Sequence, residues 1–388
     1  MTWPLHRLED LTEPDRPITY GVVKPGPEDP VSGVKFIRGG DIFEGNLAIE
    51  NLRTITPEIS KSYSRTLLSG GELVVSLVGN PGHVAVVPKS LAGANLARQA
   101  GLVALRNEID ADFVKFFLMS PQGRAELFAQ MTGSVQVVIN LHNLRTVRVP
   151  LPSLPVQRRI AGILSAYDEL MENNRRRIRL LEAMARALYR EWFVRPCQAG
   201  KLPKGWETKK LGDLADIRWG DTSTTKASYV EEGFAAYSAS GLDGKLDHFD
   251  FDRTGIVLSA IGAQCGKTWL ARGKWSCIKN TIRFWSKDDS ASTEYLFIAT
   301  EGQDFWPRRG AAQPFISQGD SERKELVIPD GGTMGRFTAF ATDALEQIAV
   351  LETQIQNLRR TRDLLLPRLL SGQVELSPAE LEIKEHLQ

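Results

Sequence analysis

The chain has 388 residues, of which 42% are hydrophobic and 24% charged, and its formal net charge is +1. This length favours two domains, and the ordinary globular composition excludes an extensively disordered chain. A near-neutral chain has no global field that attracts a polyanion, so any nucleic-acid site must be a local basic patch.

The cysteines and the N-terminus set the expected compartment. Cys197, Cys265 and Cys277 are scattered, with no histidine or cysteine cluster beside them, which excludes a disulfide framework and a structural zinc site. The N-terminal "MTWPLHRLEDL" lacks the apolar core of a signal peptide, and no stretch reaches 18 apolar residues. We therefore expect a cytoplasmic protein with no membrane partner and no metal site.

Residues 1–152 predict a globular α+β domain. Strand-like runs such as "ELVVSLV" (72–78) and "VAVVP" (84–88) precede a helical stretch, "ADFVKFFLMS" (111–120). Glycines punctuate these runs, as the turns of a sheet-rich domain require.

Residues 153–196 predict one long helix. It should begin near Pro155 and end near Phe193, before Pro196, which makes a rod of roughly 57 Å at 1.5 Å per residue. Apolar residues recur at alternating steps of four and three, which is the seam of a coiled coil. The seam residues are Ile160, Leu164, Tyr167, Met171, Ile178, Leu181, Ala185, Leu188 and Trp192, with the polar Asn174 among them.

An arginine cluster lies on this predicted helix. Arg175, Arg176, Arg177 and Arg179 cover several helix faces, so that some of them must face outward. A solvated surface is one interpretation, and contact with phosphates or with an acidic protein surface is the other.

Residues 197–330 predict a second globular domain that repeats the first. Four motifs recur in the same order, and each copy is followed by a long helical segment, so we interpret the chain as a tandem duplication. The motif pairs are "WPLHRLEDL" (3–11) with "WETKKLGDL" (206–214), "VVSLVGNPGHV" (74–84) with "VLSAIGAQCGKT" (257–268), Gly133-x2-Gln136-x2-Ile139 with Gly310-x2-Gln313-x2-Ile316, and "VRVP" (147–150) with "LVIP" (326–329).

Residues 331–372 predict the second long helix, starting near Met334, and 373–388 form an acidic tail. The seam again steps by four and three, through Phe337, Ala341, Ala344, Ile348, Leu351, Ile355, Leu358, Leu365 and Leu369, with Arg362 as its polar interruption. We expect the two helices to pack as an antiparallel coiled coil that separates the two domains with pseudo-twofold symmetry. The alternative is two independent helices, each packed on its own domain.

No catalytic constellation is present in the sequence. "IGAQCGKTW" (261–269) resembles a P-loop, but Gly262 is one residue too close to Gly266 and no phosphate-capping helix follows. "NPGH" (80–83) lacks the second proline and the aromatic residue of an amino-methyltransferase motif, and the histidines show no metal-ligand spacing. This absence favours a recognition or adaptor protein over an enzyme.

The chain resembles the specificity subunits of Type I restriction–modification enzymes over essentially its whole length. The most specific match is the central block 149–194, "VPLPSLPVQRRIAGILSAYDELMENNRRRIRLLEAMARALYREWFV". "LLPRLLSGQVEL" (365–376), "KLPKGWETKKLGDL" (201–214) and "VKFIRGGDI" (34–42) resemble further parts of the family. The second helix departs from the pattern, because "PDGGTMGRF" (329–337) replaces the proline-rich, Gln157-containing start of the first.

The resemblance implies a non-catalytic subunit without a cofactor of its own. Each globular domain would read one half of a bipartite double-stranded DNA site, and the helices would set the spacing. Two modification subunits, which carry S-adenosylmethionine and methylate adenine, would dock on the helices, and ATP- and magnesium-dependent restriction subunits would join them. A coiled-coil scaffold with two adaptor domains and no DNA role is the rival interpretation.

The candidate site residues come from the paired loops and the first helix. Glutamine suits adenine edges and arginine suits guanine edges or phosphates, although glutamines shared by both copies are equally explained by a structural role. The candidates for DNA contact are Arg38, Asn80, His83, Gln136, Gln264, Lys267, Arg308, Arg309 and Gln313. The candidates for partner contact are Gln157, Arg175, Arg176, Arg177 and Arg179.

Overall fold

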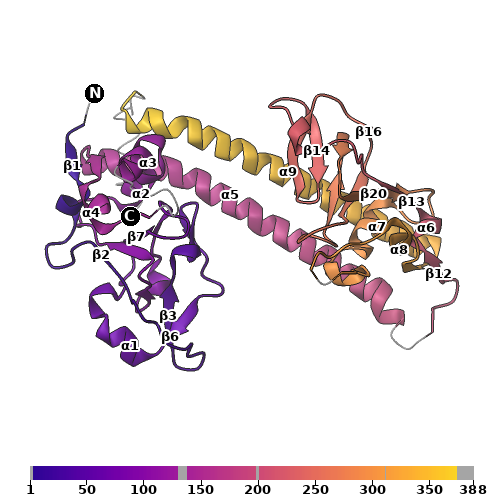
Figure 1. Ribbon diagram of the computed structural model, residues 1–388, viewed down its shortest axis with the longest axis horizontal. Helices are drawn as coiled ribbons and strands as arrows, with labels where there is room; N and C mark the ends of the chain where they lie inside the picture. The colour runs from indigo at the N-terminus through magenta and orange to yellow at the C-terminus, as the bar shows by residue number, and fades with distance from the viewer. Residues whose placement is uncertain (1–2, 130–137, 198–200, 311, 374–388) are drawn as a thin grey trace, which may run out of the picture. The chain divides into compact units, whose positions relative to one another are not determined.

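The computed structural model describes residues 3–129, 138–197, 201–310 and 312–373 (Figure 1). The chain divides into two compact units, one of residues 1–173 with 354–388 and one of residues 174–353. Each unit thus combines a globular part with one half of each long helix.

The globular part of the first unit contains two main sheets. The four-stranded sheet has the order β2 (Thr19–Tyr20), β10 (Ala100–Val103), β7 (Leu73–Ser76) and β8 (Val84–Val86). The three-stranded sheet has the order β6 (Arg53–Ile55), β3 (Val34–Ile37) and β9 (Asn95–Leu96). The remaining elements are β1 (Leu5–Arg7), the hairpin β4 (Ile42–Phe43) and β5 (Asn46–Leu47), α1 (Pro57–Ser62), α2 (Ala111–Met119), α3 (Pro121–Phe128), α4 (Leu141–Thr146) and β11 (Arg148–Pro150).

The globular part of the second unit repeats this arrangement. Its first sheet has the order β13 (Ala215–Trp219), β20 (Thr281–Ser286), β17 (Gly255–Ser259) and β18 (Thr268–Ala271). Its second sheet has the order β15 (Gly241–Leu246), β14 (Phe234–Ser238), β19 (Lys274–Cys277) and β16 (Phe251–Asp252). The remaining elements are β12 (Glu207–Lys210), α6 (Leu211–Leu214), α7 (Thr293–Ala299), α8 (Gln318–Glu322) and β21 (Glu325–Ile328).

The sheet registers confirm the predicted duplication. Ser76 of β7 lies opposite Ala100 of β10, and Ser259 of β17 lies opposite Thr281 of β20 in the matching sheet. In both copies the second sheet places a parallel pair, β3–β9 and β14–β19, beside an antiparallel neighbour. The second copy adds one edge strand, β16.

The first and fourth repeat motifs form one small sheet in each copy. β1 pairs antiparallel with β11, and β12 pairs antiparallel with β21. The leucines of the first motif, Leu8 and Leu11 in one copy and Leu211 and Leu214 in the other, are at most 1% exposed. The beginning and the end of each globular part therefore meet at the point where the chain passes into a long helix.

The first long helix, α5, spans Leu154–Tyr189 and continues through a π-helical turn at Arg190–Val194. Its seam is buried at Ile160, Leu164, Met171 and Ala185, as predicted. Asn174 on the seam is 8% exposed.

The second long helix, α9, spans Gly331–Leu370. It begins three residues before the predicted start because Asp330 caps it: the backbone N–H of Thr333 donates to Asp330 Oδ1 at 3.0 Å, and the Thr333 hydroxyl donates to Oδ2 at 2.8 Å. An aspartate cap thus replaces the proline-rich start that the first helix uses.

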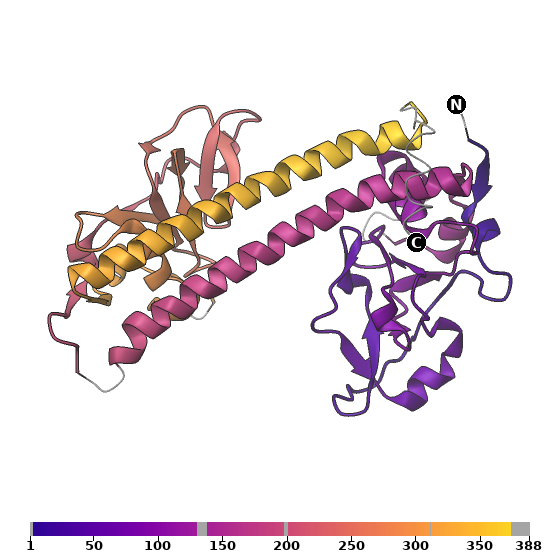
Figure 2. The same cartoon turned by 180° about the vertical axis from the view of Figure 1, so that it is seen from behind.

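Within each unit the halves of α5 and α9 lie side by side (Figure 2) and share a hydrophobic core. In the first unit Leu164 of α5 lies in one buried cluster with Leu366 and Leu369 of α9, and in the second unit Ala185 of α5 lies in one with Phe337 of α9. The N-terminal half of each helix therefore meets the C-terminal half of the other, which confirms the antiparallel packing and excludes two independent helices.

Candidate nucleic-acid interface

The second repeat motif forms a matched turn in each copy. In the first copy the turn joins β7 to β8: the N–H of Ser76 donates to the carbonyl of His83 at 2.8 Å, and the N–H of Gly82 donates back to the Ser76 carbonyl at 2.9 Å. Gly79 and Gly82 have φ angles of 94° and 86°, which disfavour any other residue. This geometry is what the two glycines of the motif provide.

The turn of the second copy joins β17 to β18 in the same way. Ser259 N–H donates to the Lys267 carbonyl at 2.8 Å, and Gly266 N–H donates to the Ser259 carbonyl at 2.9 Å. A strand follows this turn instead of a helix, so that "GAQCGKT" has no helix N-terminus to hold a phosphate. His83 and Lys267 hold equivalent positions, and their side chains differ.

The third motif lies beside this turn in both copies. Ile139 N–H donates to the Leu77 carbonyl at 3.0 Å, and Ile316 N–H donates to the Ala260 carbonyl at 2.8 Å. In the second copy Gly262 N–H also donates to the Pro314 carbonyl at 3.0 Å. The two loops are therefore neighbours in the second copy, and in the first copy Ile139, the described end of the third motif, lies beside the turn.

The first copy brings three candidates around its turn. Asn80 is exposed on the turn and His83 is half-buried at its end. Arg38 precedes Gly39, whose Cα approaches the Val78 carbonyl so closely that a Cβ would lie 3.0 Å from it. The guanidinium of Arg38 bonds Asp41 at 2.9 and 3.1 Å, which fixes it in place and raises its pKa.

His83 has an environment that favours the neutral ring. Burial, and then the charge of nearby Arg124, lower the pKa of His83 below its ordinary 6.5. Its ring lies 5.2 Å from that of Phe43. His83, Arg124 and Arg359 line a hollow of about 610 Å³ in the first unit. A neutral imidazole there can donate or accept a hydrogen bond at a base edge.

The second copy brings four candidates together. Lys267 is exposed at the end of the turn, Gln264 is half-buried within it, and its backbone carbonyl accepts from Lys267 N–H at 2.9 Å. Arg308 is 38% exposed, 3.5 Å from Asp304, and Arg309 is 58% exposed and paired with the buried carboxylate of Asp320. Asp320 holds Arg309 in position while more than half of the Arg309 side chain remains accessible.

The two repeats share a glutamine in the third motif, Gln136 in the first copy and Gln313 in the second. Gln136 lies outside the described residues. Gln313 is exposed, and its backbone carbonyl would lie 2.7 Å from a Cβ at Gly310, which has φ 81°. The shared pattern of this loop thus includes a glycine that the backbone geometry demands.

Gln157 is buried at the start of α5. It is 1% exposed, its Oε1 accepts from Asp110 N–H at 2.9 Å, and its Nε2 donates to the Pro152 carbonyl at 2.8 Å. In this structure its amide joins the start of α5 to the start of α2, and the partner contact at Gln157 stays a prediction. Arg176, Arg177 and Arg179 are exposed on α5, and Arg175 is half-buried.

Sequence reasoning missed an aromatic and cationic cluster on the second copy. The guanidinium carbons of Arg253 and Arg283 lie 4.4 and 4.1 Å from the centre of the Trp285 ring. Arg283 and Trp285 correspond to Leu102 and Ala104 of the first copy, so this cluster belongs to one copy alone. The available signal was the spacing of Arg283 and Trp285 two residues apart on β20, which places both side chains on one face of the strand.

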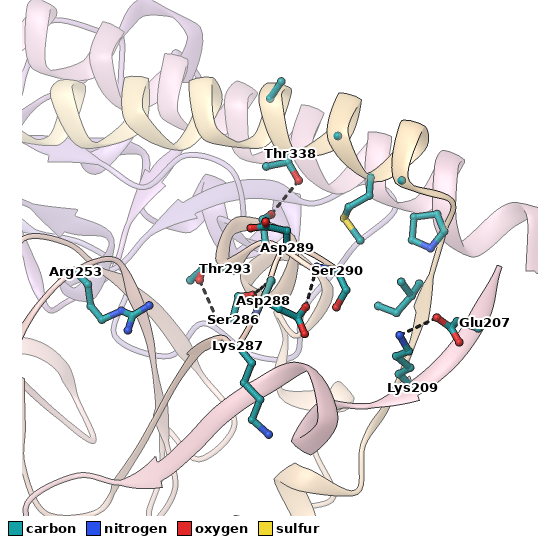
Figure 3. A pocket seen from close by; sticks show the side chains of 17 residues that line it. Glu207, Lys209, Arg253, Ser286, Lys287, Asp288, Asp289, Ser290, Thr293 and Thr338 are labelled. Carbon is teal, nitrogen blue, oxygen red and sulfur yellow. Dashed lines mark hydrogen bonds and ion pairs between the residues drawn. The ribbon is translucent and has the colours of Figure 1, made fainter. Parts of the chain in front are cut away.

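Arg253 also lines a hollow of about 880 Å³ (Figure 3). Lys209 and Lys287 line it as well, but Glu207, Asp288 and Asp289 balance their charge. Lys209 lies 2.8 Å from Glu207. Since its acidic and basic groups match in number, this hollow is a weaker place for a phosphate than the exposed cations of the paired loops.

Two further classes of site were searched across the described part of the chain. Within it, no group of three or more His, Cys, Asp or Glu side chains could hold a metal ion, and no helix is long and apolar enough to cross a membrane. The three cysteines are free, and burial raises the pKa of Cys277 to about 12.

Similar proteins share both the sequence and the fold. The specificity subunit of the Type I restriction enzyme MjaIX of Methanocaldococcus jannaschii is 21% identical over 423 residues, covering 96% of this chain and 94% of the relative. The EcoBI specificity subunit of Escherichia coli is 26% identical over 244 residues, which cover 62% of this chain and 49% of the relative. The solved structure of a Type I S subunit from M. genitalium matches with a TM-score of 0.62 at 16% identity, covering 97% of both chains, which shows a common fold.

The family assignment rests on a model that matches twice. The Type I restriction modification DNA specificity domain matches residues 18–183 and again residues 203–333. These two matches span most of the chain and coincide with the two copies of the duplicated fold. The chain therefore belongs to the Type I restriction–modification DNA specificity family and is the DNA specificity subunit of such a system.

Proposed function

We propose that each copy of the specificity domain reads one half of a bipartite DNA site. The observation that carries this proposal is the pair of matched turns. The turn Ser76–His83 and the turn Ser259–Lys267, which is one residue longer, are closed by the same two hydrogen bonds, while the side chains at the turns differ. One scaffold with two sets of side chains is what reading two different half-sites requires.

Cations near these turns would position the DNA through its phosphates. Lys267 and Arg308 are exposed, and Arg309 is held by Asp320 with most of its surface accessible. Asn80, His83 and Gln264 would contact base edges in the major groove. Because the net charge of the chain is only +1, partner subunits would supply much of the remaining phosphate binding.

The long helices would carry the partners and set the spacing of the half-sites. Two modification subunits would dock on them, with Arg176 and Arg177 among the exposed contact groups on α5. S-adenosylmethionine would belong to those subunits, and ATP with magnesium to a restriction subunit. A cytoplasmic location fits these partners.

Exchange of one domain tests the proposal. Residues 201–330 are replaced by the equivalent segment of a family member with a different specificity, and the chain is expressed with its modification subunit. Methylome sequencing should then show one half-site changed and the other unchanged, since each copy has its own sheets. Simultaneous change of both half-sites would refute the modular interpretation.

A second experiment distinguishes a DNA-reading subunit from a scaffold without a DNA role. The intact chain with its modification subunit should retain a specific duplex, and replacing Lys267 by Gln should weaken that retention and lower its salt dependence. Gln356→Lys, an exposed change on α9, is the matched control. A complex that shows no sequence preference in retention would favour the scaffold.

A further inference from the structure

The two long helices correspond residue by residue. α5 begins at position 154 and α9 at position 331, a separation of 177 positions. At that separation Ile160 matches Phe337 and Leu164 matches Ala341, and all four are 0% exposed. Most apolar positions match along both seams, so these apolar residues alone cannot distinguish one helix from the other; the seams differ at Asn174, which matches Leu351, and at Arg362, which matches Ala185.

Because the two seams are similar, a duplicated chain could exchange helices with a second copy of itself. If two copies met while folding, α5 of one could pair with α5 of the other, and α9 with α9, as in domain swapping. The N-terminal half of each helix would still meet a C-terminal half, which is the contact both seams provide. Some other feature must therefore select α9 as the partner of α5.

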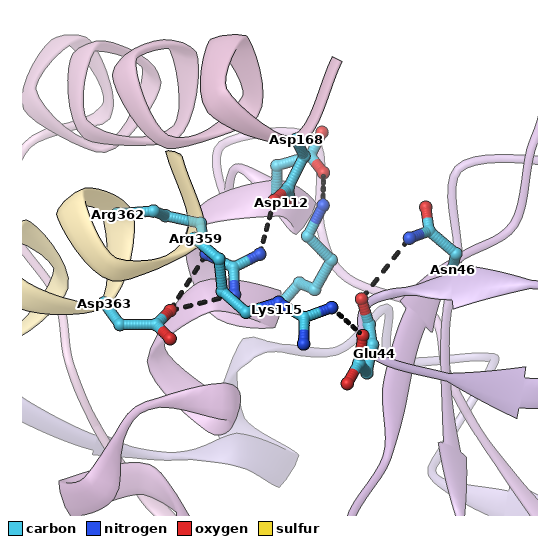
Figure 4. A network of polar contacts seen from close by, with 8 residues as sticks. All are labelled: Glu44, Asn46, Asp112, Lys115, Asp168, Arg359, Arg362 and Asp363. Atoms are coloured by element: carbon cyan, nitrogen blue, oxygen red, sulfur yellow. Dashed lines mark hydrogen bonds and ion pairs between the residues drawn. The ribbon is translucent and has the colours of Figure 1, made fainter. Parts of the chain in front are cut away.

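In the first unit, two ion pairs connect the C-terminal half of α9 to its surroundings (Figure 4). Arg362 pairs with Asp168 of α5, and their side chains are only 14% and 19% exposed. Arg359 reaches Glu44 in the turn between β4 and β5, at 2.8 Å. Arg362 also bonds Asp363, which completes its environment.

In the second unit, the equivalent positions carry different chemistry. The positions that match Asp168 and Arg362 are Leu345 and Ala185, which are 7% and 4% exposed and line one hollow of about 310 Å³. Glu182 stands where α9 has Arg359, and Arg186 stands where α9 has Asp363. Arg186 pairs with Glu301 of the globular part at 2.8 Å.

These differences penalise the pairing of α5 with a second α5. The C-terminal half of the second α5 would bring Ala185 opposite Asp168, and the buried carboxylate would lose its cation. It would also bring Glu182 opposite Glu44, where α9 has Arg359, so that an attraction becomes a repulsion between like charges.

The pairing of α9 with a second α9 is penalised as well. It would bring Arg362 opposite Leu345, so that the largely buried guanidinium would lose Asp168 and keep only Asp363 of its own helix. It would also place Asp363 beside Glu301, where α5 has Arg186. Each wrong pairing therefore removes the largely buried ion pair between Asp168 and Arg362 and creates one like-charge contact.

We propose that these ion pairs are a recognition code that makes α9 the partner of α5 and rejects a second copy of either helix. The interface thus fits one partner, the other repeat of the same chain. If the two domains read half-sites of unlike sequence, as proposed above, each helix pair must join one copy of each domain, and this code ensures that arrangement.

The first experiment gives α9 the charges of α5 in the full chain. Arg359→Glu with Arg362→Ala gives these two positions the side chains that a second α5 would present there, those of Glu182 and Ala185. Equilibrium unfolding in urea should show the folding constant lowered by about tenfold or more, because Asp168 loses its cation. Adding Glu44→Arg and Asp168→Leu rebuilds a matching surface and should restore the midpoint.

The control substitutions lie on the same helix, α9. Arg360→Glu with Arg368→Ala makes the same charge change at exposed positions of α9 and should leave the midpoint nearly unchanged. If the test pair loses no more stability than this control, or if the two added substitutions do not restore it, the code does not exist.

The second experiment measures partner choice directly. Tagged and untagged full chains are unfolded together, refolded, and captured through the tag. The natural chain should carry almost no untagged copy, whereas the chain with all four substitutions at Glu44, Asp168, Arg359 and Arg362 accepts α5 against α5 and should carry about tenfold more. Equal capture by both chains would overturn the proposal.

Discussion

Replacing Gln157 by Met should destabilise the first unit without any loss of a partner contact. Methionine is the residue that the repeat itself uses there, since Met334 holds the equivalent position on α9 and is 5% exposed. Both residues donate their backbone N–H four residues back, to Ser153 and Asp330, at 3.0 Å. The substitution therefore fits the backbone and removes only the amide.

The magnitude follows from the two hydrogen bonds that the amide makes. Gln157→Met leaves the N–H of Asp110 and the carbonyl of Pro152 without their partners, which costs about 1–3 kcal/mol each. The thioether recovers about 1 kcal/mol through burial of apolar surface. A net loss of about 1–5 kcal/mol should lower the melting temperature of this unit by roughly 2–20 °C.

The assay is thermal and urea unfolding of the full chain, followed by titration with the modification subunit. Gln356→Met, at an exposed position of α9, is the control and should change stability by no more than about 0.5 kcal/mol. Unchanged stability of Gln157→Met, together with weaker binding of the modification subunit, would refute the structural role and return this residue to the partner surface.

Two further changes test the core and the acid response. Phe337→Ala should lower the free energy of unfolding by about 3–5 kcal/mol, because its fully buried ring meets Phe193 edge-on with 4.8 Å between centroids. Val350→Ala, at an exposed position of the same helix, is the control and should lower it by less than about 0.5 kcal/mol. Similar losses for both variants in thermal unfolding would contradict the packing. Burial raises the pKa of Glu72, but hydrogen bonds from Arg16 and from backbone N–H groups outweigh it and hold this pKa below 4.5. Its stabilisation is therefore complete above about pH 4.5 and lost as the pH falls through the lower folded value, so Glu72→Gln should flatten the decline of the urea midpoint between about pH 5 and pH 3, and an unchanged slope would exclude this role.

Some site residues could be placed from the sequence because a repeat identifies them. The glycines of the matched turns, Gly79 and Gly262, recur in both copies because the chain there has φ angles of 94° and 103°. Asn80 and Lys267, which lie on the same turns, could be singled out for the opposite reason, that these positions differ between copies. Arg253 could not be found in this way, because its place beside Trp285 depends on a sheet whose register a single sequence does not reveal.

The sequence by itself determined the duplication, the two long helices and the seam that joins them. The duplication follows from a repeated order of motifs, and the helices and their seam follow from the regular spacing of apolar residues. Tertiary structure alone decided what the polar residues do. Gln157 is buried because α2 lies against the start of α5, and Arg362 can interrupt an apolar seam because Asp168 stands opposite it. Both roles depend on groups distant in the chain, and a side chain's neighbours across space follow from packing, which no local pattern encodes.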